Sequence, residues 1–326
     1  MNSAPLQLGE PLQLFFRMRA SLLLAALCGP MTTTASRDLL VAENDLKPWP
    51  SGHGEDPPPL GSLVQVNATS GQRHIVATDI VDPVWVVSDG KAAYIGLFHS
   101  GEIVRVALNN GSMLTVAKGL SCPEGVALDQ HGFLYVVENP VGNECRQPTR
   151  KPEAQLTKID LRTGTQTKVA GLRSSTGGDE GGPHGLAIEG DNAFVCECPA
   201  GAAALTQVNL DNGTKTQIVP LNSPSGCAVG SGYAFVVEQG RSGQLVQVEL
   251  ATGSKTILMD ELRGPMGVAL DLTRPCSRPN GLCGSVYVAP RMKNEVLKYD
   301  LERRAWDIFA DSEKVPFNSP IGLAVV

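Results

Sequence analysis

Two side chains with acid–base chemistry occupy the same place in a five-residue motif that recurs along the chain. The motif reads Pro, a variable residue x, Gly, an apolar residue and Ala, and x is Glu124 in one copy and His184 in the next. A carboxylate and an imidazole that face one site can divide the roles of general acid and base at neutral pH. We therefore take Glu124 and His184 as the candidate catalytic pair. In the alternative interpretation, both side chains only contact water or bond to loop amides.

The remaining copies of the motif carry less reactive groups at x. These are Ser225, Met266, Ile321 and, in a degenerate copy, Val84. Ser225 offers a hydroxyl and Met266 an apolar surface, so both are candidate substrate-binding residues. No nucleophile elbow surrounds Ser225, which argues against a Ser-His-Glu nucleophilic triad. His99 lies in a predicted loop on the same side as the x residues and is a further candidate substrate-binding residue, although a solvent-facing orientation is the simpler expectation for a loop histidine.

The motif forms the first of four short strands in a repeat of roughly 40 residues. The second strand is apolar and ends in Glu in several copies, as in FLYVVE at 133–138 and YAFVVE at 233–238. The third strand alternates apolar and polar residues, and a Gly-containing turn such as Asn110-Gly111 joins it to the fourth. Four short strands per repeat of this length are typical of a propeller blade.

The two ends of the chain complete one repeat. Residues 38–44 (DLLVAEN) match 133–139 (FLYVVEN) and predict a second strand, and the last seven residues supply the first strand that is missing before it. This pairing would close the ring and remove exposed sheet edges. The predicted fold class is all-β, a six-bladed propeller of four-stranded blades over residues 37–326. The blades are expected at 80–118, 121–170, 183–219, 224–259, 265–310, and 320–326 joined to 37–77.

The motif strand followed by a Tyr/Phe-Val-x-Glu strand resembles the six-bladed superfamily of senescence-marker-protein/gluconolactonases, strictosidine-synthase-like enzymes and NHL-repeat proteins. The resemblance covers residues 37–326. It implies a hydrolase, lactonase, lyase or cyclase that acts on a small organic molecule at the mouth of the central channel. The NHL branch implies the alternative, a non-catalytic propeller that binds a protein or a glycan.

Metal binding in this superfamily depends on the x positions. In the gluconolactonase branch, equivalent positions carry Glu, Asn and Asp oxygens that hold a divalent cation. A hard cation such as Ca²⁺ needs six or more oxygen ligands, whereas the ring here supplies one carboxylate, one imidazole and one hydroxyl. We therefore expect neither a metal site nor a cofactor.

Four blades end their second strand with the same acid, at Glu43, Glu138, Glu197 and Glu238. Such repetition favours a structural role. Each side chain would accept hydrogen bonds from backbone amides at the turn into the third strand. The alternative is a carboxylate cage for a cation.

Residues 1–36 have the order of a targeting segment. Arg17 and Arg19 precede the apolar run 20–28, and small residues follow at 33–36; this order is typical of a secretory signal. The Thr-rich, acid-poor composition also suits an organelle transit peptide, and translation beginning at Met18 is a further alternative. We expect a secreted protein or, alternatively, one in an organelle lumen after the leader is removed.

The charge and hydropathy of the sequence limit the classes of partner that the protein is expected to bind. Lys and Arg total 27 against 33 Asp and Glu, a net charge of −6 without a basic block, which argues against nucleic acid. The sequence contains no run of 18 apolar residues, so it does not predict a transmembrane segment. A monomer that binds a small-molecule ligand is the expectation.

Modification sites fit a secreted protein. The sequons at Asn67, Asn110 and Asn212 lie in predicted turns between third and fourth strands, on the face opposite the channel mouth, and predict glycosylation. Cys276 and Cys283 bracket a short Pro/Gly-rich loop and predict a disulfide. A Cys122–Cys145 disulfide would pin a long insertion, and Cys145–Cys198 is equally allowed. Cys196 and Cys227, inside strands, are expected to be buried small apolar residues.

Overall fold

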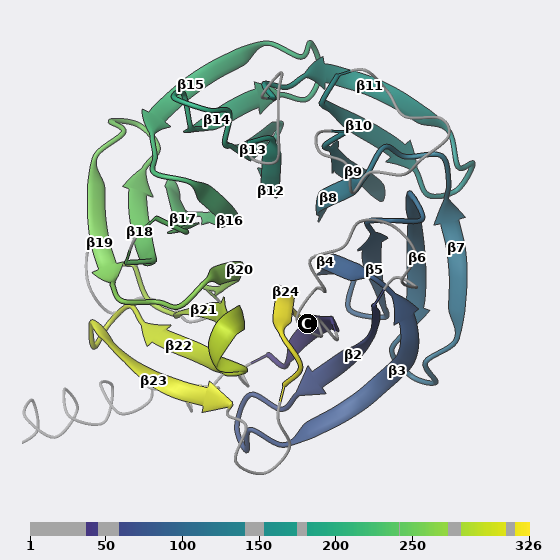
Figure 1. Ribbon diagram of the computed structural model, residues 1–326, viewed down its shortest axis with the longest axis horizontal. Coiled ribbons are helices and arrows are strands. Elements are labelled where there is room, and N and C mark those ends of the chain that lie inside the picture. The colour runs from purple at the N-terminus through teal and green to yellow at the C-terminus, as the bar shows by residue number, and fades with distance from the viewer. Residues whose placement is uncertain are drawn as a thin grey trace, which may run out of the picture. The chain divides into compact units, whose positions relative to one another are not determined.

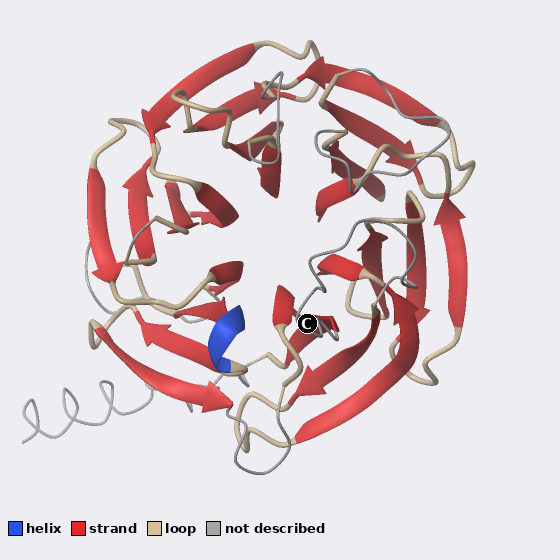
Figure 2. Ribbon diagram, in the orientation of Figure 1, coloured by secondary structure: helices blue, strands red, loops and turns tan. Residues whose placement is uncertain are grey.

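The chain forms six four-stranded antiparallel sheets arranged as the blades of a ring (Figure 1). The computed structural model describes residues 37–44, 59–140, 153–174, 181–240, 242–272, 282–310 and 317–326. The predicted targeting segment 1–36 lies outside these residues. Within them, the only helical segment is the single 3-10 turn Arg291–Lys293, shown in blue in Figure 2. The predicted all-β, six-bladed propeller is confirmed.

Each blade runs from an inner strand at the ring centre to an outer strand at the rim. The first blade consists of β24 (Pro320–Val325), β1 (Leu39–Asn44), β2 (Leu60–Val66) and β3 (Arg73–Val81). The second consists of β4 (Pro83–Ser88), β5 (Ala92–Leu97), β6 (Glu102–Ala107) and β7 (Met113–Ala117). The third consists of β8 (Pro123–Leu128), β9 (Phe133–Glu138), β10 (Gln155–Asp160) and β11 (Gln166–Gly171).

The other three blades repeat the same order. The fourth consists of β12 (Pro183–Glu189), β13 (Asn192–Glu197), β14 (Ala204–Asn209) and β15 (Lys215–Pro220). The fifth consists of β16 (Pro224–Gly230), β17 (Tyr233–Glu238), β18 (Gln244–Glu249) and β19 (Lys255–Met259). The sixth consists of β20 (Pro265–Asp271), β21 (Ser285–Pro290), β22 (Val296–Asp300) and β23 (Ala305–Ala310).

The C-terminal strand closes the ring, as predicted. β24 pairs antiparallel with β1, with Leu323 opposite Val41 and Ala324 opposite Leu40. Beyond the strand, the Val326 N–H donates to the Asp38 carbonyl over 2.8 Å. The first blade is therefore built from both ends of the chain, and its inner strand lies between β20 and β4 (Figure 1).

The hydrophobic core consists of seams between neighbouring blades. One seam, for example, joins Phe194 and Leu205 of the fourth blade to Val236 and Val246 of the fifth. Both faces of a second strand pack against neighbours, so β9 is apolar and almost completely buried, whereas the outer strand β11 is exposed along its first half. Since the seams occur all round the ring, each blade depends on the two beside it.

The motif glycine is explained by the packing of adjacent inner strands. A Cβ atom at Gly185 would lie 2.3 Å from the Ser225 carbonyl oxygen, and one at Gly125 would lie 2.4 Å from the His184 carbonyl oxygen. Gly267 meets the Ile321 carbonyl in the same way, at 2.3 Å. The backbone of the next blade occupies the space of a side chain, so only glycine allows the inner strands to approach this closely.

The four glutamates that end second strands have the predicted kind of role, but their amide donors differ from the prediction. Each accepts a hydrogen bond from a backbone N–H in the connection that leads into strand one, not from the turn into strand three. The donors are Asn318 for Glu43, Ser121 for Glu138, Arg173 for Glu197 and Asn222 for Glu238. The acid thus ties the end of strand two to the start of its own blade, because these two segments meet on one face of the ring.

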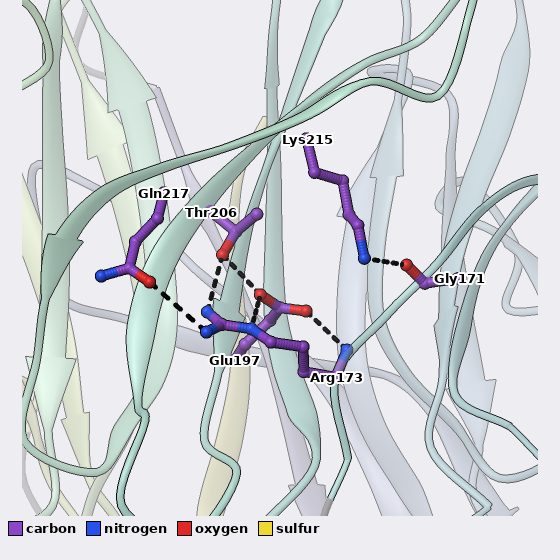
Figure 3. Close-up of polar contacts among 6 residues, drawn as sticks. All are labelled: Gly171, Arg173, Glu197, Thr206, Lys215 and Gln217. Carbon is purple, nitrogen blue, oxygen red and sulfur yellow. Dashed lines mark hydrogen bonds and ion pairs between the residues drawn. The ribbon is translucent and has the colours of Figure 1, made fainter.

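Glu197 shows the fullest version of this arrangement (Figure 3). Its side chain is completely buried. One oxygen accepts the Arg173 backbone N–H over 2.7 Å, and the other accepts Arg173 Nε over 2.9 Å and the Thr206 hydroxyl. Nearby, Lys215 Nζ donates to the Gly171 carbonyl over 2.6 Å. Since Gly171 ends the third blade and Lys215 belongs to the fourth, the Lys215–Gly171 bond joins two blades near the rim.

Candidate functional site

The x residues begin the inner strands at one face of the ring, which we call the mouth face. Antiparallel order places the connections into strand one and the loops between strands two and three on this same face. The turns between strands three and four lie on the opposite face. The mouth face therefore gathers Glu124, His184, Ser225 and Met266 from four consecutive blades.

The structure brings the candidate catalytic pair together. Glu124 on β8 and His184 on β12 lie in adjacent blades, and Glu124 Oε1 is 3.5 Å from His184 Nδ1. The His184 side chain is 30% exposed and that of Glu124 11% exposed. The imidazole is thus the more accessible member of the pair, and the carboxylate lies behind it.

A third residue, Trp85 on β4, completes the arrangement. Its Nε1–H donates to Glu124 Oε2 over 3.2 Å, so each carboxylate oxygen has a partner. Trp85 is buried, with 6% of its surface exposed. Trp85 was not among the residues predicted from the sequence, although a signal was present: it stands where the other five copies of the motif have glycine.

Two opposing effects act on the pKa of His184. Burial by itself would lower the pKa, because it disfavours the charged imidazolium. The negative charge of Glu124 and its hydrogen bond to the ring act in the opposite direction and prevail, so the pKa is raised above its ordinary value of 6.5. At neutral pH, His184 is therefore protonated to a greater extent than a histidine in water.

Replacing Glu124 by Gln is expected to lower the pKa of His184, because the charge is removed while the burial remains. A titration of the imidazole proton resonances by NMR measures this, with His184→Gln assigning the signal.

The same pair makes stability depend on pH. In the wild type the folded-state pKa of His184 is raised, so the stabilisation of the fold by the His184–Glu124 pair is fully present below about pH 6.5 and is lost as pH rises through the folded value. For a partly exposed pair it amounts to about 0.5–1 kcal/mol. A pKa that is the same in Glu124→Gln would contradict the pairing.

Ser225 and Met266, the predicted substrate-binding residues, contact each other. Ser225 Oγ lies 3.5 Å from Met266 Sδ, and Ser225 is 2% exposed. Gln239, which follows the second strand of the same blade as Ser225, also directs its side-chain amide at Met266 Sδ over 2.6 Å. Ser225 is thus buried against Met266, and Met266 also contacts Gln239, a polar residue that the sequence did not single out.

His99 is partly buried and not solvent-facing, since 18% of its side chain is exposed. Its Nδ1 makes a short contact with Asp82, whose other oxygen accepts Asn44 Nδ2 over 2.6 Å. The Phe98 and His99 rings pack edge to face. Asn44 and Asp82 come from the first blade and from the connection into the second, so this cluster joins neighbouring blades on the mouth face.

The predicted modification sites are placed in part by the structure. Asn67, Asn110 and Asn212 are all exposed and lie in turns between third and fourth strands. Cys122 and Cys283 are disulfide-bonded. The proposed partners, Cys145 and Cys276, lie outside the described residues, so both pairings stay predictions. Cys196 and Cys227 are buried thiols in one apolar seam, as expected, and burial raises the pKa of Cys196.

Metal-ligating side chains do not gather within the described ranges, where no three His, Cys, Asp or Glu residues are arranged to hold an ion. Nor do these ranges contain a helix that is long and apolar enough to cross a membrane.

The chain has the fold of solved propellers with very different sequences. It is similar to a chain of a nidogen/laminin complex, with 14% identity, a TM-score of 0.64, and coverage of 88% of this chain and 97% of that one. It is also similar to TolB from Acinetobacter baumannii, with 14% identity, a TM-score of 0.57, and coverage of 94% and 71%. No family model and no curated protein matches the sequence. At such low identity the likeness shows the propeller fold alone.

Proposed function

We propose that the propeller is an enzyme that binds a small organic molecule at its mouth face and transfers a proton through His184. The observation that carries the proposal is the chain of contacts Trp85–Glu124–His184. Glu124 is buried and bonded on both oxygens, so it orients the imidazole and favours its protonated form. His184 is exposed enough to meet a ligand. A reaction of the hydrolase, lactonase, lyase or cyclase type, in which a leaving oxygen or carbonyl needs a proton, fits such a group.

A panel of esters, lactones and lyase substrates, assayed with and without a chelator, tests this proposal. We expect turnover that persists with chelator and falls at least tenfold, about 1.4 kcal/mol in the barrier, in His184→Gln and Glu124→Gln. If His184 donates the proton, the rate falls as pH rises through its pKa, and Glu124→Gln moves that decline to lower pH.

The control is Lys118→Ala, which removes the ion pair between the exposed Lys118, directly after β7, and Glu102 at the start of β6, and should leave turnover unchanged. Turnover that is lost with chelator would refute metal-free catalysis. Turnover that is unaffected in His184→Gln would refute the assignment of the proton donor. An inactive wild type across the whole panel counts against catalysis.

The second candidate is a non-catalytic propeller that binds a protein or glycan. The burial of Trp85 and Glu124 at the ring centre favours it, because neither group is directly open to a ligand. The similar nidogen chain comes from a complex with laminin, which is a property of that protein. A binding module predicts that His184→Gln weakens capture of the partner without any associated turnover.

We further propose that the protein is a secreted glycoprotein, or one in an organelle lumen. Exposed sequons and the disulfide bonds of Cys122 and Cys283 support an oxidising compartment. A gain in electrophoretic mobility after enzymatic removal of N-linked glycans tests this; unchanged mobility of protein purified from a secreting eukaryotic cell would refute glycosylation.

A further inference from the structure

Trp85 breaks the rule that governs the inner strands. In the other five copies of the motif, the position holds glycine, and neighbouring backbone fills the space of a side chain. β4 has a ten-atom side chain there instead. Part of it packs in the seam between the second and third blades, with Val126 and Leu120. The rest must extend toward the centre of the ring.

The indole ends against the opposite blade. A Cβ atom at Gly226 would lie 2.9 Å from Trp85 Cη2 and 3.1 Å from Cζ3. Gly226 belongs to β16, and β16 and β4 face each other across the ring, with β8 and β12 between them on one side and β20 and β24 on the other (Figure 1). The Trp85 ring therefore lies across the axis of the propeller.

Each end of the indole meets a group suited to it. The N–H donates to Glu124 Oε2 over 3.2 Å, and the benzene edge meets a glycine, which leaves room because it has no side chain. A Cβ atom at position 226 would first meet the Met266 carbonyl oxygen, at 2.2 Å, and would also lie within 2.9 Å of the ring. A hydrogen bond to a carboxylate is stronger than one between neutral groups. The bond to Glu124 therefore fixes the position of the indole N–H, as the packing fixes the position of the ring.

We propose that the axis of the propeller contains a binding slot for a planar aromatic ring with one N–H donor, and that the chain fills this slot with its own Trp85. Glu124 is the acceptor, Gly226 defines the far end, and the apolar side chains around Val126 form part of the wall. A ligand at the mouth face therefore meets a closed axis, with the indole as its floor. The slot shares Trp85 and Glu124 with the proposed site, but it does not require that His184 transfers a proton.

The test is to empty the slot and refill it with a free ligand. Trp85→Gly restores the residue that the other five copies carry. We expect this variant to bind indole, measured by calorimetry and by a rise in the melting temperature, whereas the wild type and Trp85→Phe, whose slot is filled by a ring, bind none. Indene has the shape of indole without the N–H, and should bind at least tenfold more weakly because the bond to the Glu124 carboxylate is lost.

Each of these measurements can support or refute the proposed slot. A folded Trp85→Gly protein that ignores indole refutes the slot, and equal affinity for indole and indene refutes the role of Glu124. Equal binding of indole by the wild type places the ligand elsewhere and also refutes it. If Trp85→Gly unfolds, indole added during refolding should restore a cooperative transition; failure to do so, while Trp85→Phe folds, overturns the proposal. No substrate is involved, so none of these results bears on turnover by His184.

Discussion

Removing residues 317–326 is expected to abolish the cooperative unfolding transition at 25 °C, because the first blade then lacks its inner strand. Ile321 and Leu323 are 3% and 5% exposed, and the buried strand β1 loses one of its two pairing strands and keeps only β2. Burial of each large apolar side chain contributes about 1.5–3 kcal/mol. The loss of two such side chains, together with the opening of the ring, approaches the whole stability of a domain, about 5–15 kcal/mol. Circular dichroism during thermal or urea unfolding measures the loss.

A circular permutant provides the matched control. Leu39 lies opposite Val325, and Val326 bonds to Asp38, so the two ends already lie as neighbours in a hairpin. Placing residues 317–326 ahead of Asp38 through an Asn-Gly turn, which suits a two-residue hairpin, should restore stability to within about 1 kcal/mol, since only the connection changes. A truncated chain as stable as the permutant would contradict closure of the ring by β24.

The motif glycine predicts the second large effect. Gly185→Ala is expected to destabilise the fold by about 3 kcal/mol, the upper range for overpacking. The new methyl group would lie 2.3 Å from the Ser225 carbonyl oxygen and 2.9 Å from the Cys227 nitrogen. Both are backbone atoms of the next blade, so no side chain can rotate away, and the two inner strands must separate. Urea denaturation measures the difference.

Gly96 is the comparison position, because it lies in a second strand rather than a first. A methyl group there meets its nearest atoms at 3.5 Å, an ordinary contact. Gly96→Ala should change stability by less than about 1 kcal/mol and can even stabilise the fold, because alanine restricts the unfolded chain. Equal losses in the two variants would show that strand propensity, and not the approach of the blades, requires glycine in the motif.

The blade pattern was readable from the sequence because it is local. Each repeat carries its own strands, turns and motif, so the six blades and the closure by β24 follow from periodicity. The adjacency of Glu124 and His184 follows equally, since equivalent positions in consecutive blades are neighbours. The structural role of the strand-two glutamates was also predictable, but their amide donors were not. Ser121 precedes β8 and Glu138 ends β9, so both inner strands of the blade separate them along the chain, and only the folded blade brings them together.

What the sequence by itself determined is therefore the repeat, the count of blades and the ring of x residues. Only the tertiary structure decided what occupies the axis, because Trp85 meets Gly226 from a blade three places away, and no local pattern relates them. The same holds for Asn44, Asp82 and His99, which come from different strands and loops. Repetition determines contacts between neighbours, whereas a side chain that crosses the ring depends on the geometry of all six blades together.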